Sequence, residues 1–363
     1  MTADNAPLPA AEIPVIPVGH LPSAELCRHA PERVRALVAE ALSRRSHPLL
    51  PLATGFIDAL SHSWLARQAN PYLEEIRHVA RAVGRPGAYF LNTVYEWACS
   101  TSVATDPIGE GARMIRVLDW GMPGLGRHVV VARHETAHGP FYNATWPGYA
   151  GVLTAMAPGR FCAAINQAPR VPAFGHRALD EVVTRLRVLL TQGTLPAAHL
   201  LRRAFEEAKD FEAAVAILAD ESVAVAMPAI FSLSGTAPDE FCVVEALGKL
   251  RRVHRGPGAL GVANQWLSSD LAGAPRNESI TTLPWTTPAV NNAAREAMIR
   301  ALQTGAFAGT DDLEEPVLNS HTVMVVVANA QRGEMRIEAL DPQAGEILPR
   351  VVARCHLRHQ EAA

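Results

Sequence analysis

Two short segments of the sequence carry side chains whose types and spacing could do chemistry. The first is HETAH at 134–138, which matches the H-E-x-x-H pattern of zinc peptidases. In those enzymes both imidazoles lie on one face of a helix and the glutamate is the general base. The second is Cys99, which is followed by hydroxyl residues at 100–102 and could be a nucleophile.

The surroundings of the HETAH segment argue against a zinc site. RHVVVA before it is a strand pattern, and Gly139-Pro140 directly after it excludes the helical turns that the motif needs. On a strand the two histidines would lie about 13 Å apart, too far to share a metal ion. We therefore interpret 134–138 as a polar turn, expect no metal or other cofactor, and keep a zinc peptidase only as an alternative.

Cysteine usage sets Cys99 apart. The five cysteines, at positions 27, 99, 162, 242 and 355, form neither a disulfide framework nor a C-x-x-C pair. Four of them stand in helical or β-type surroundings that are typical of small core residues. Cys99 lies instead at the junction between a helical block and the first β-type segment. Its residue types alone leave two interpretations open, a core cysteine and a nucleophile.

Composition excludes several classes of protein. Of 363 residues, 48% are apolar and 19% are charged, which is enough apolar surface for a large core. A net charge of −3 and a sequence pI of about 6.5 argue against a polybasic surface, so we expect no nucleic-acid partner. Neither a secretory signal pattern nor an apolar run of membrane-spanning length occurs. We expect a cytoplasmic protein.

The order of the segments predicts helices and strands in blocks. Residues 1–24 are rich in proline and indicate an extended arm, and apolar spacing of three and four predicts helices between 31 and 83. From 88 to 166, short β-type segments are bounded by glycine and proline. Blocks of this kind favour an α+β fold of stacked layers around antiparallel sheets over a doubly wound parallel sheet. Further along, we expect helices at 176–192, 196–209, 211–219 and near 289–303, strands at 227–233 and 240–247, and a closing hairpin of HTVMVVVANA and EMRIEAL.

Around Cys99 the sequence becomes recognisable. NTVYEWACSTSVATDPIGEGARMIRVLDWG (92–121) resembles the processing site and first β-hairpin of acid ceramidase and N-acylethanolamine acid amidase. These are cysteine N-terminal-nucleophile (Ntn) hydrolases, related more distantly to the choloylglycine hydrolases. The resemblance covers most of residues 88–340, and its further segments follow in the same order, at 146–169, 199–235, 262–279 and 315–337.

The resemblance implies an Ntn-hydrolase fold, an αββα sandwich of stacked antiparallel sheets preceded by a helical segment. It also implies that the chain cuts itself between Ala98 and Cys99. The expected products are an N-terminal arm and helical α-chain segment, residues 1–98, and a catalytic β-chain segment, residues 99–363. We expect these partners to stay together in one globule.

Self-cleavage would solve a chemical problem of the intact chain. An internal cysteine has no dedicated base nearby in this sequence, whereas a freed α-amine, with a pKa of roughly 7.7–8.0, can accept the thiol proton. The resemblance assigns Asp119 to orient that amine and Arg116 to stabilise a thiolate or oxyanion. Residues 116 and 119 point to opposite faces of a straight strand, so we expect a bend or bulge near Asp119, at Trp120-Gly121.

The segment at 262–279 supplies two more expected site residues. Asn264 is expected to donate to the oxyanion, and Arg276 to anchor the site through an ion pair. Outside this context Asn264 would be interpreted as a turn residue, and Arg116 with Asp119 as a surface ion pair. One position departs from the family: Gln167 stands where the ceramidase-like members carry Glu, so a carboxylate role there is lost.

The expected function is hydrolysis of the amide bond of N-acyl amides, of the fatty-acyl kind, through an acyl-cysteine intermediate. An acyltransferase using the same acyl-cysteine is one alternative. A catalytically silent relative that binds a lipid or a protein partner is another, and Gln167 is the residue that keeps it open. Apolar helix faces in 50–83 could line an acyl pocket or touch lipid surfaces, although packing against a sheet is the commoner fate of such faces.

Overall fold

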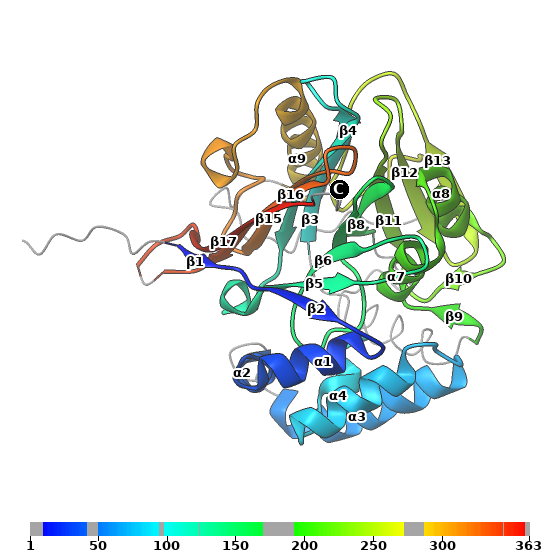
Figure 1. The fold of residues 1–363 in the computed structure, drawn as a ribbon, viewed down its shortest axis with the longest axis vertical. Coiled ribbons are helices and arrows are strands. Elements are labelled where there is room, and N and C mark those ends of the chain that lie inside the picture. The colour runs from blue at the N-terminus through cyan, green and yellow to red at the C-terminus, as the bar shows by residue number, and fades with distance from the viewer. Residues whose placement is uncertain are drawn as a thin grey trace, which may run out of the picture.

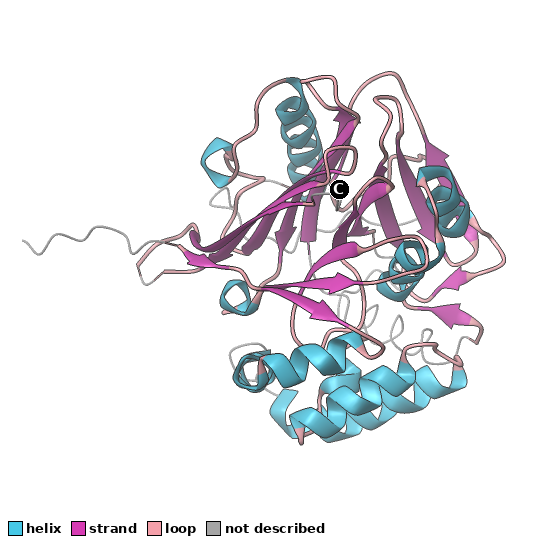
Figure 2. Ribbon diagram, in the orientation of Figure 1, coloured by secondary structure: helices cyan, strands magenta, loops and turns pink. Residues whose placement is uncertain are grey.

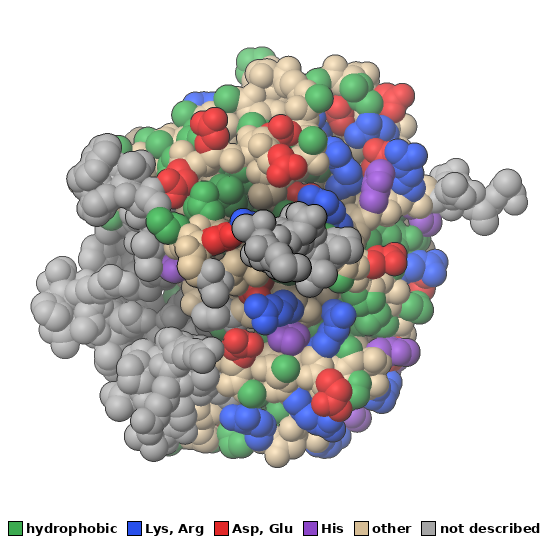
Figure 3. All heavy atoms as spheres, turned by 90° about the vertical axis from the view of Figure 1, so that its left-hand side faces the viewer, with side chains coloured by type: hydrophobic (Ala, Val, Ile, Leu, Met, Phe, Trp, Pro, Cys, Tyr) green, Lys and Arg blue, Asp and Glu red, His purple; other side chains and the backbone are tan. Residues whose placement is uncertain are grey.

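A computed structural model describes residues 10–41, 50–93, 98–122, 124–169, 192–271, 287–343 and 345–359. Most of the helix expected at 176–192 lies outside these residues, and so does Arg276. Within the part of the chain described, no helix is both long and apolar enough to cross a membrane. On the face drawn in Figure 3, basic and acidic side chains lie interspersed, as the near-neutral charge balance predicts.

Two β-sheets form the body of the molecule (Figures 1 and 2). Sheet A has the strand order β1 (Ala11–Glu12), β17 (Arg350–Arg358), β16 (Glu334–Asp341), β15 (Thr322–Asn329), β4 (Ala112–Asp119), β3 (Ala98–Thr105) and β14 (Leu260–Val262). Sheet B has the order β13 (Leu250–His254), β12 (Phe241–Leu247), β11 (Ala229–Ser234), β8 (Phe161–Gln167), β7 (Thr154–Ala157), β6 (Phe141–Thr145), β5 (Val130–His134) and β2 (Val15–Val18). A separate parallel pair joins β9 (Thr194–Leu195) to β10 (Ala224–Val225).

Helices cover both outer faces of this sandwich. Sheet B carries α7 (Ala197–Glu207) and α8 (Phe211–Ala219), and sheet A carries α9 (Pro288–Ala301) (Figure 1). Asp210 caps the start of α8 by accepting from the Ala213 amide, and Thr287 does the same for α9 with Pro288 at its first position. Because sheet A has apolar neighbours on both faces, β4 and β15 are buried along their whole length.

The N-terminal part of the chain forms a helical layer across one end of the sandwich (Figure 1). It consists of α1 (Pro22–His29), α2 (Pro31–Ala41), α3 (Leu50–Arg67), α4 (Leu73–Val83) and the short α5 (Ala88–Leu91). Gly84 ends α4 in the left-handed conformation. Short 3-10 turns at Leu125–His128, Leu302–Thr304 and Thr310–Asp312 complete the described elements.

The N-terminal segment is built into the sandwich. β1 pairs with β17 at the edge of sheet A, and β2 pairs with β5 at the edge of sheet B, so one arm extends both sheets. A buried ion pair adds a second tie: the Arg202 guanidinium on α7 contacts the Glu75 carboxylate on α4 at 2.8 Å. Ser23 donates its amide to the same carboxylate and its hydroxyl to the Tyr149 carbonyl. Residues before and after position 98 are therefore buried together in the same interior.

The α+β sandwich of stacked layers is confirmed, with several corrections. The sheets are mixed and not purely antiparallel, because β1 and β2 run parallel to their neighbours. The arm turns helical already at Pro22, and 88–91 is a helical turn where a β-type segment was expected. The strands that were not predicted are β1, β2, β9, β10, β13, β14 and β17. The HETAH segment behaves as expected: β5 ends at His134, and a turn closes from Thr136 to Gly139. Within the described residues no cluster of three His, Cys, Asp or Glu could hold a metal ion.

Buried neutral histidine should make this fold sensitive to acid. His199 on α7 is buried, its Nδ1 lies 2.9 Å from the Asn70 Nδ2, and burial lowers its pKa to about 3. In the unfolded chain the imidazole titrates near 6.5, so the unfolded state takes up protons first as the pH falls. The stability this group contributes is complete above pH 6.5 and is lost progressively towards pH 3.

We therefore expect the free energy of unfolding to fall between pH 7 and pH 5, by about 2 kcal/mol from His199 alone. Urea unfolding at each pH measures it. His199→Gln should flatten the pH dependence while lowering stability at pH 7, whereas His138→Gln, at an exposed position, should leave the slope unchanged. Equal slopes for wild type and His199→Gln would contradict the prediction.

Candidate active site

Cys99 is the second residue of β3, in the interior of the sandwich. Strand alternation turns the side chains of residues 99 and 101 towards sheet B and those of 100 and 102 towards α9. The contacts agree: the Thr101 hydroxyl donates to the Asn166 Oδ1 on β8 at 2.6 Å, and the Ser100 hydroxyl accepts from Arg295 on α9 at 3.0 Å. The Cys99 Sγ lies 3.9 Å from the Ile165 carbonyl oxygen, and the side chain is fully buried.

Asn264 lies directly opposite Cys99. β14 pairs with β3 so that Leu260, Gly261 and Val262 face Val103, Ser102 and Thr101, and the same register continued for two residues brings position 264 to position 99. The Cys99 amide indeed donates to the Asn264 Oδ1 at 3.0 Å. The Asn264 Nδ2 donates to the Gln167 carbonyl at 2.8 Å, and its own amide donates to the Asn292 Oδ1 at 2.8 Å.

Arg116 lies on the inner face of sheet A, beside Cys99. Its Nη1 donates to the Asn166 Oδ1 at 2.7 Å and to the Thr101 Oγ1 at 3.2 Å, and its Nη2 donates to the Ile165 carbonyl at 2.9 Å. The guanidinium is fully buried, so its charge acts in a medium of low polarity. This is a fixed internal cation and not half of a surface ion pair.

Asp119 lies on the opposite, outer face of the same strand and binds a second arginine. The Arg295 Nη2 contacts the Asp119 Oδ2 at 2.7 Å, and both side chains are 0% exposed. The Thr322 hydroxyl donates to the other carboxylate oxygen at 2.8 Å. Arg295 also donates from Nη1 to the Asn264 Oδ1 at 3.0 Å. One guanidinium therefore connects β3, β4 and the Asn264 loop.

The electrostatics keep the Cys99 thiol protonated in the intact chain. Burial raises the pKa of this thiol above its ordinary value, and the carboxylate of Asp119 raises it further. The two buried cations, Arg116 and Arg295, lower the pKa but do not reverse the shift. Thiolate chemistry at neutral pH therefore needs a base that takes the thiol proton during reaction.

The structure brings most of the expected residues together. Cys99, Arg116, Asp119 and Asn264 all lie at one end of β3 and β4. No bend places Arg116 and Asp119 on one face; they remain on opposite faces, and the irregularity next to Asp119 lies in its partner strand, between Thr322 and Met324. Gln167 meets the site through its backbone carbonyl, and neither polar atom of its buried side chain has a partner among the described residues.

Arg295 was missed by sequence reasoning. An ion-pairing arginine was expected at Arg276, which lies outside the described residues, whereas the guanidinium on Asp119 comes from the middle of α9. A signal existed, because helical spacing in the predicted helix at 289–303 places Arg295 on one face with Asn291, Asn292 and Ile299, and this is the buried face of α9. Nothing in the sequence indicates which strand that helix covers.

The arrangement joins a buried thiol, a peptide bond before it, two fixed cations and a side-chain amide. Nucleophilic attack on a carbonyl needs these parts, together with a proton acceptor. The intact chain has Ala98 on the amino side of Cys99, so the first carbonyl within reach of the thiol is that of the chain itself.

The chain is similar to several known proteins. No protein-family model matches the chain. The N-acylethanolamine-hydrolyzing acid amidase of Cavia porcellus is 27% identical over 314 residues, which are 83% of this chain and 81% of that protein. Among solved structures, the Caenorhabditis elegans ortholog of that amidase is 17% identical, with a TM-score of 0.49, and the similarity covers 64% of this chain and 93% of that one. For a mutant of the conjugated bile acid hydrolase of Clostridium perfringens the identity is 10%, the TM-score 0.39 and the coverage 73% and 97%.

The ion pair in the site yields a stability prediction. Arg295→Met leaves the Asp119 carboxylate buried without its cation, and we expect it to lower the free energy of unfolding by about 3–5 kcal/mol. Arg203→Met is the matched control, because it removes an exposed pair with Glu207 on α7 and should cost less than about 1 kcal/mol. Urea unfolding measures both. Equal unfolding midpoints for the two variants would show that the buried pair is no structural tie.

Proposed function

We propose that the chain is an Ntn hydrolase like the N-acylethanolamine acid amidase to which it is similar, and that it hydrolyses N-acyl amides with Cys99 as nucleophile. The observation that carries the proposal is the position of Cys99. It follows the peptide bond to Ala98 and lies between the cation of Arg116 and the side chain of Asn264. A cysteine that only filled space in a core would not gather buried charges around it.

Activation is proposed to be a cut of the chain by its own thiol. The Cys99 Sγ attacks the Ala98 carbonyl carbon and the thiol proton passes to the peptide nitrogen, so the acyl group moves from nitrogen to sulfur as the peptide C–N bond breaks. Water then hydrolyses the thioester, which releases the Ala98 carboxylate and leaves Cys99 with a free α-amine. That amine is the base that the intact chain lacks.

Turnover repeats the same chemistry on a substrate. The α-amine takes the thiol proton, Sγ attacks the amide carbonyl, and the amine returns the proton to the leaving nitrogen as the C–N bond breaks. Water hydrolyses the resulting thioester to the free acid. In this proposal Asn264 donates to the developing oxyanion and Arg116 supports its charge, while Asp119, held by Arg295, keeps the amine in place.

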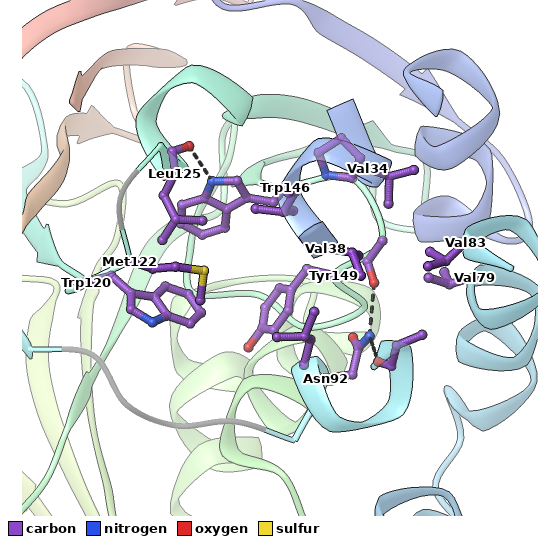
Figure 4. Close-up of a pocket in the computed structure, with 15 residues that line it drawn as sticks. Val34, Val38, Val79, Val83, Asn92, Trp120, Met122, Leu125, Trp146 and Tyr149 are labelled. Carbon is purple, nitrogen blue, oxygen red and sulfur yellow. Dashed lines mark hydrogen bonds between the residues drawn. The ribbon is translucent and has the colours of Figure 1, made fainter. Parts of the chain in front are cut away.

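An apolar pocket beside the site supports an acyl substrate (Figure 4). It lies between the N-terminal helices and two loops of the sandwich, and its wall begins at Trp120, the residue after Asp119. Apart from Asn92, its side chains are apolar or aromatic: Val34, Leu37, Val38, Val79, Val83, Ala88, Leu91, Trp120, Met122, Leu125, Trp146, Pro147 and Tyr149. In the helical segment, Val79 and Val83 face the pocket, whereas Phe56 on α3 is 71% exposed.

The size of the pocket bears on the length of the acyl chain. Its cavity of about 50 Å³ is smaller than the roughly 150 Å³ cavity that accommodates benzene in an engineered protein. A long chain can enter only if side chains such as Leu37 and Met122 move aside. We propose that short and medium acyl chains are therefore preferred over long ones.

Self-cleavage gives the most direct test. Denaturing mass spectrometry of purified protein should show two fragments, residues 1–98 and 99–363. Cys99→Ala should yield one uncut chain with no amidase activity, because the nucleophile is gone. Cys162→Ala, at a buried cysteine of sheet B, is the matched control and should cut and hydrolyse normally.

Several results would redirect the proposal. Full amidase activity of Cys99→Ala would exclude the mechanism. If transfer to added amines exceeds release of free acid, the enzyme is an acyltransferase. An uncut chain whose Cys99 resists acylating probes would be a binding protein without catalysis.

The pocket can be tested by enlarging it. Val38→Ala removes methyl groups from the pocket wall, so it should raise kcat/KM for a longer acyl amide relative to a shorter one by about ten-fold. Val215→Ala makes the same change on α8, in core packing away from the pocket, and should leave the ratio as in the wild type. An unchanged ratio in Val38→Ala would place the acyl chain elsewhere.

A further inference from the structure

The loop that carries Asn264 is attached to sheet B by side chains that lie in one row across neighbouring strands. Ile230 on β11 pairs with Asn166 on β8 on one side and with Glu245 on β12 on the other. Residues aligned across neighbouring strands point to the same face, so Asn166 and Glu245 both project towards sheet A. Both side chains are fully buried.

These two side chains hydrogen-bond the loop on either side of Asn264. The Asn166 Nδ2 donates to the carbonyls of Val262 at 3.2 Å and Ala263 at 3.0 Å, just before it. The Glu245 carboxylate accepts the amide of Leu267 at 2.5 Å and that of Ser268 at 3.2 Å, just after it. The loop thereby crosses from β14, at the edge of sheet A, to β12 in sheet B.

His254 is part of the second attachment, the one made by Glu245. Its Nε2 lies 2.7 Å from the Glu245 Oε2 and 3.0 Å from the Ser268 hydroxyl, which also hydrogen-bonds the carboxylate. A buried carboxylate is costly unless donors surround it, and these groups supply them. The cluster is no Ser-His-Glu triad, because there the histidine uses one ring nitrogen for serine and the other for the carboxylate. Here the same Nε2 faces both.

The near end of the loop has separate anchors on α9. Asn292 accepts the Asn264 amide, and the Glu296 carboxylate accepts from the Ala263 amide at 3.3 Å and from the Gln265 side chain at 2.9 Å. Residues 263–265 are therefore tied to the helix that covers sheet A, and residues 267–268 to Glu245. Asn264 lies between these two attachments on a short span of chain.

We propose that Glu245 and His254 are positioning residues for the reaction: by fixing residues 267–268 they hold the Asn264 side chain in register with Cys99. The inference rests on the proposed amidase function. Neither residue touches Cys99 in the described contacts, so both act through Asn264. A misplacement of about 1 Å in a catalytic group can cost on the order of a hundred-fold in rate.

The test measures kcat and KM for an N-acyl amide, together with the rate of self-cleavage, in single and combined variants. Glu245→Gln should lower kcat by about ten- to a hundred-fold, with KM changed less than about two-fold, because the lost stabilisation belongs to the transition state. His254→Ala should lower it less, and His254→Gln should restore part of the loss, since its amide can donate to Glu245. In an Asn264→Ala background, Glu245→Gln should have almost no further effect.

The outcomes separate this inference from the amidase proposal. No hydrolysis by the wild type overturns the proposed function, and the inference with it. Hydrolysis by the wild type with full kcat in Glu245→Gln, or an equal loss with and without Asn264, overturns the positioning role alone. If Glu245→Gln fails to fold, His254→Ala and Ser268→Ala test the positioning role at the half-exposed side of the cluster. Arg255→Gln, which removes an exposed ion pair with Glu212 and a contact of the guanidinium with the Phe211 ring, should leave every rate unchanged.

Discussion

The ion pair between Asp119 and Arg295 is the constraint around which the site is organised. Two unit charges with no solvent contact are stable only in close mutual contact and with further hydrogen bonds to each. Arg295 meets that demand with Ser100 and Asn264, and Asp119 meets it with Thr322. The bond to Ser100 ties α9 to β3, the bond of Thr322 ties β15 to β4, and the bond to Asn264 ties α9 to the loop after β14. The same contacts that compensate the charges also fix the first residues of β3.

Burial of the site has two opposite effects on the charge of the Cys99 thiol. It raises the pKa of the Cys99 thiol, which disfavours the thiolate, and it strengthens the field of Arg116, which favours negative charge beside it. In such a site the thiol needs a base beside it for repeated turnover of a substrate. The proposed cut at residue 98 would create that base in place, without a change in the fold. Because the N-terminal arm extends both sheets, the two products would stay associated.

Local patterns predicted much of the fold. Apolar spacing placed α2, α4, α7 and α8 within a few residues, and the β15–β16 hairpin followed from two apolar runs around a turn. The patterns failed for short edge strands such as β1, β2 and β14, because a strand of two to four residues has too little alternation to recognise. They also failed at residues 88–91, where contacts with the N-terminal helices outweigh the β-type composition.

What the sequence determined by itself is the set of candidate groups: Cys99 with its hydroxyl neighbours, Arg116, Asp119 and Asn264, within a resemblance that runs along the chain in order. Only the tertiary structure decided how they combine. It put Asn264 opposite Cys99 by strand register, turned Arg116 and Asp119 to opposite faces, and brought Arg295 and Glu245 from distant segments. The reason is physical. A buried charge pairs with the opposite charge that lies next to it in space, and the packing of elements far apart in the sequence decides which residue that is.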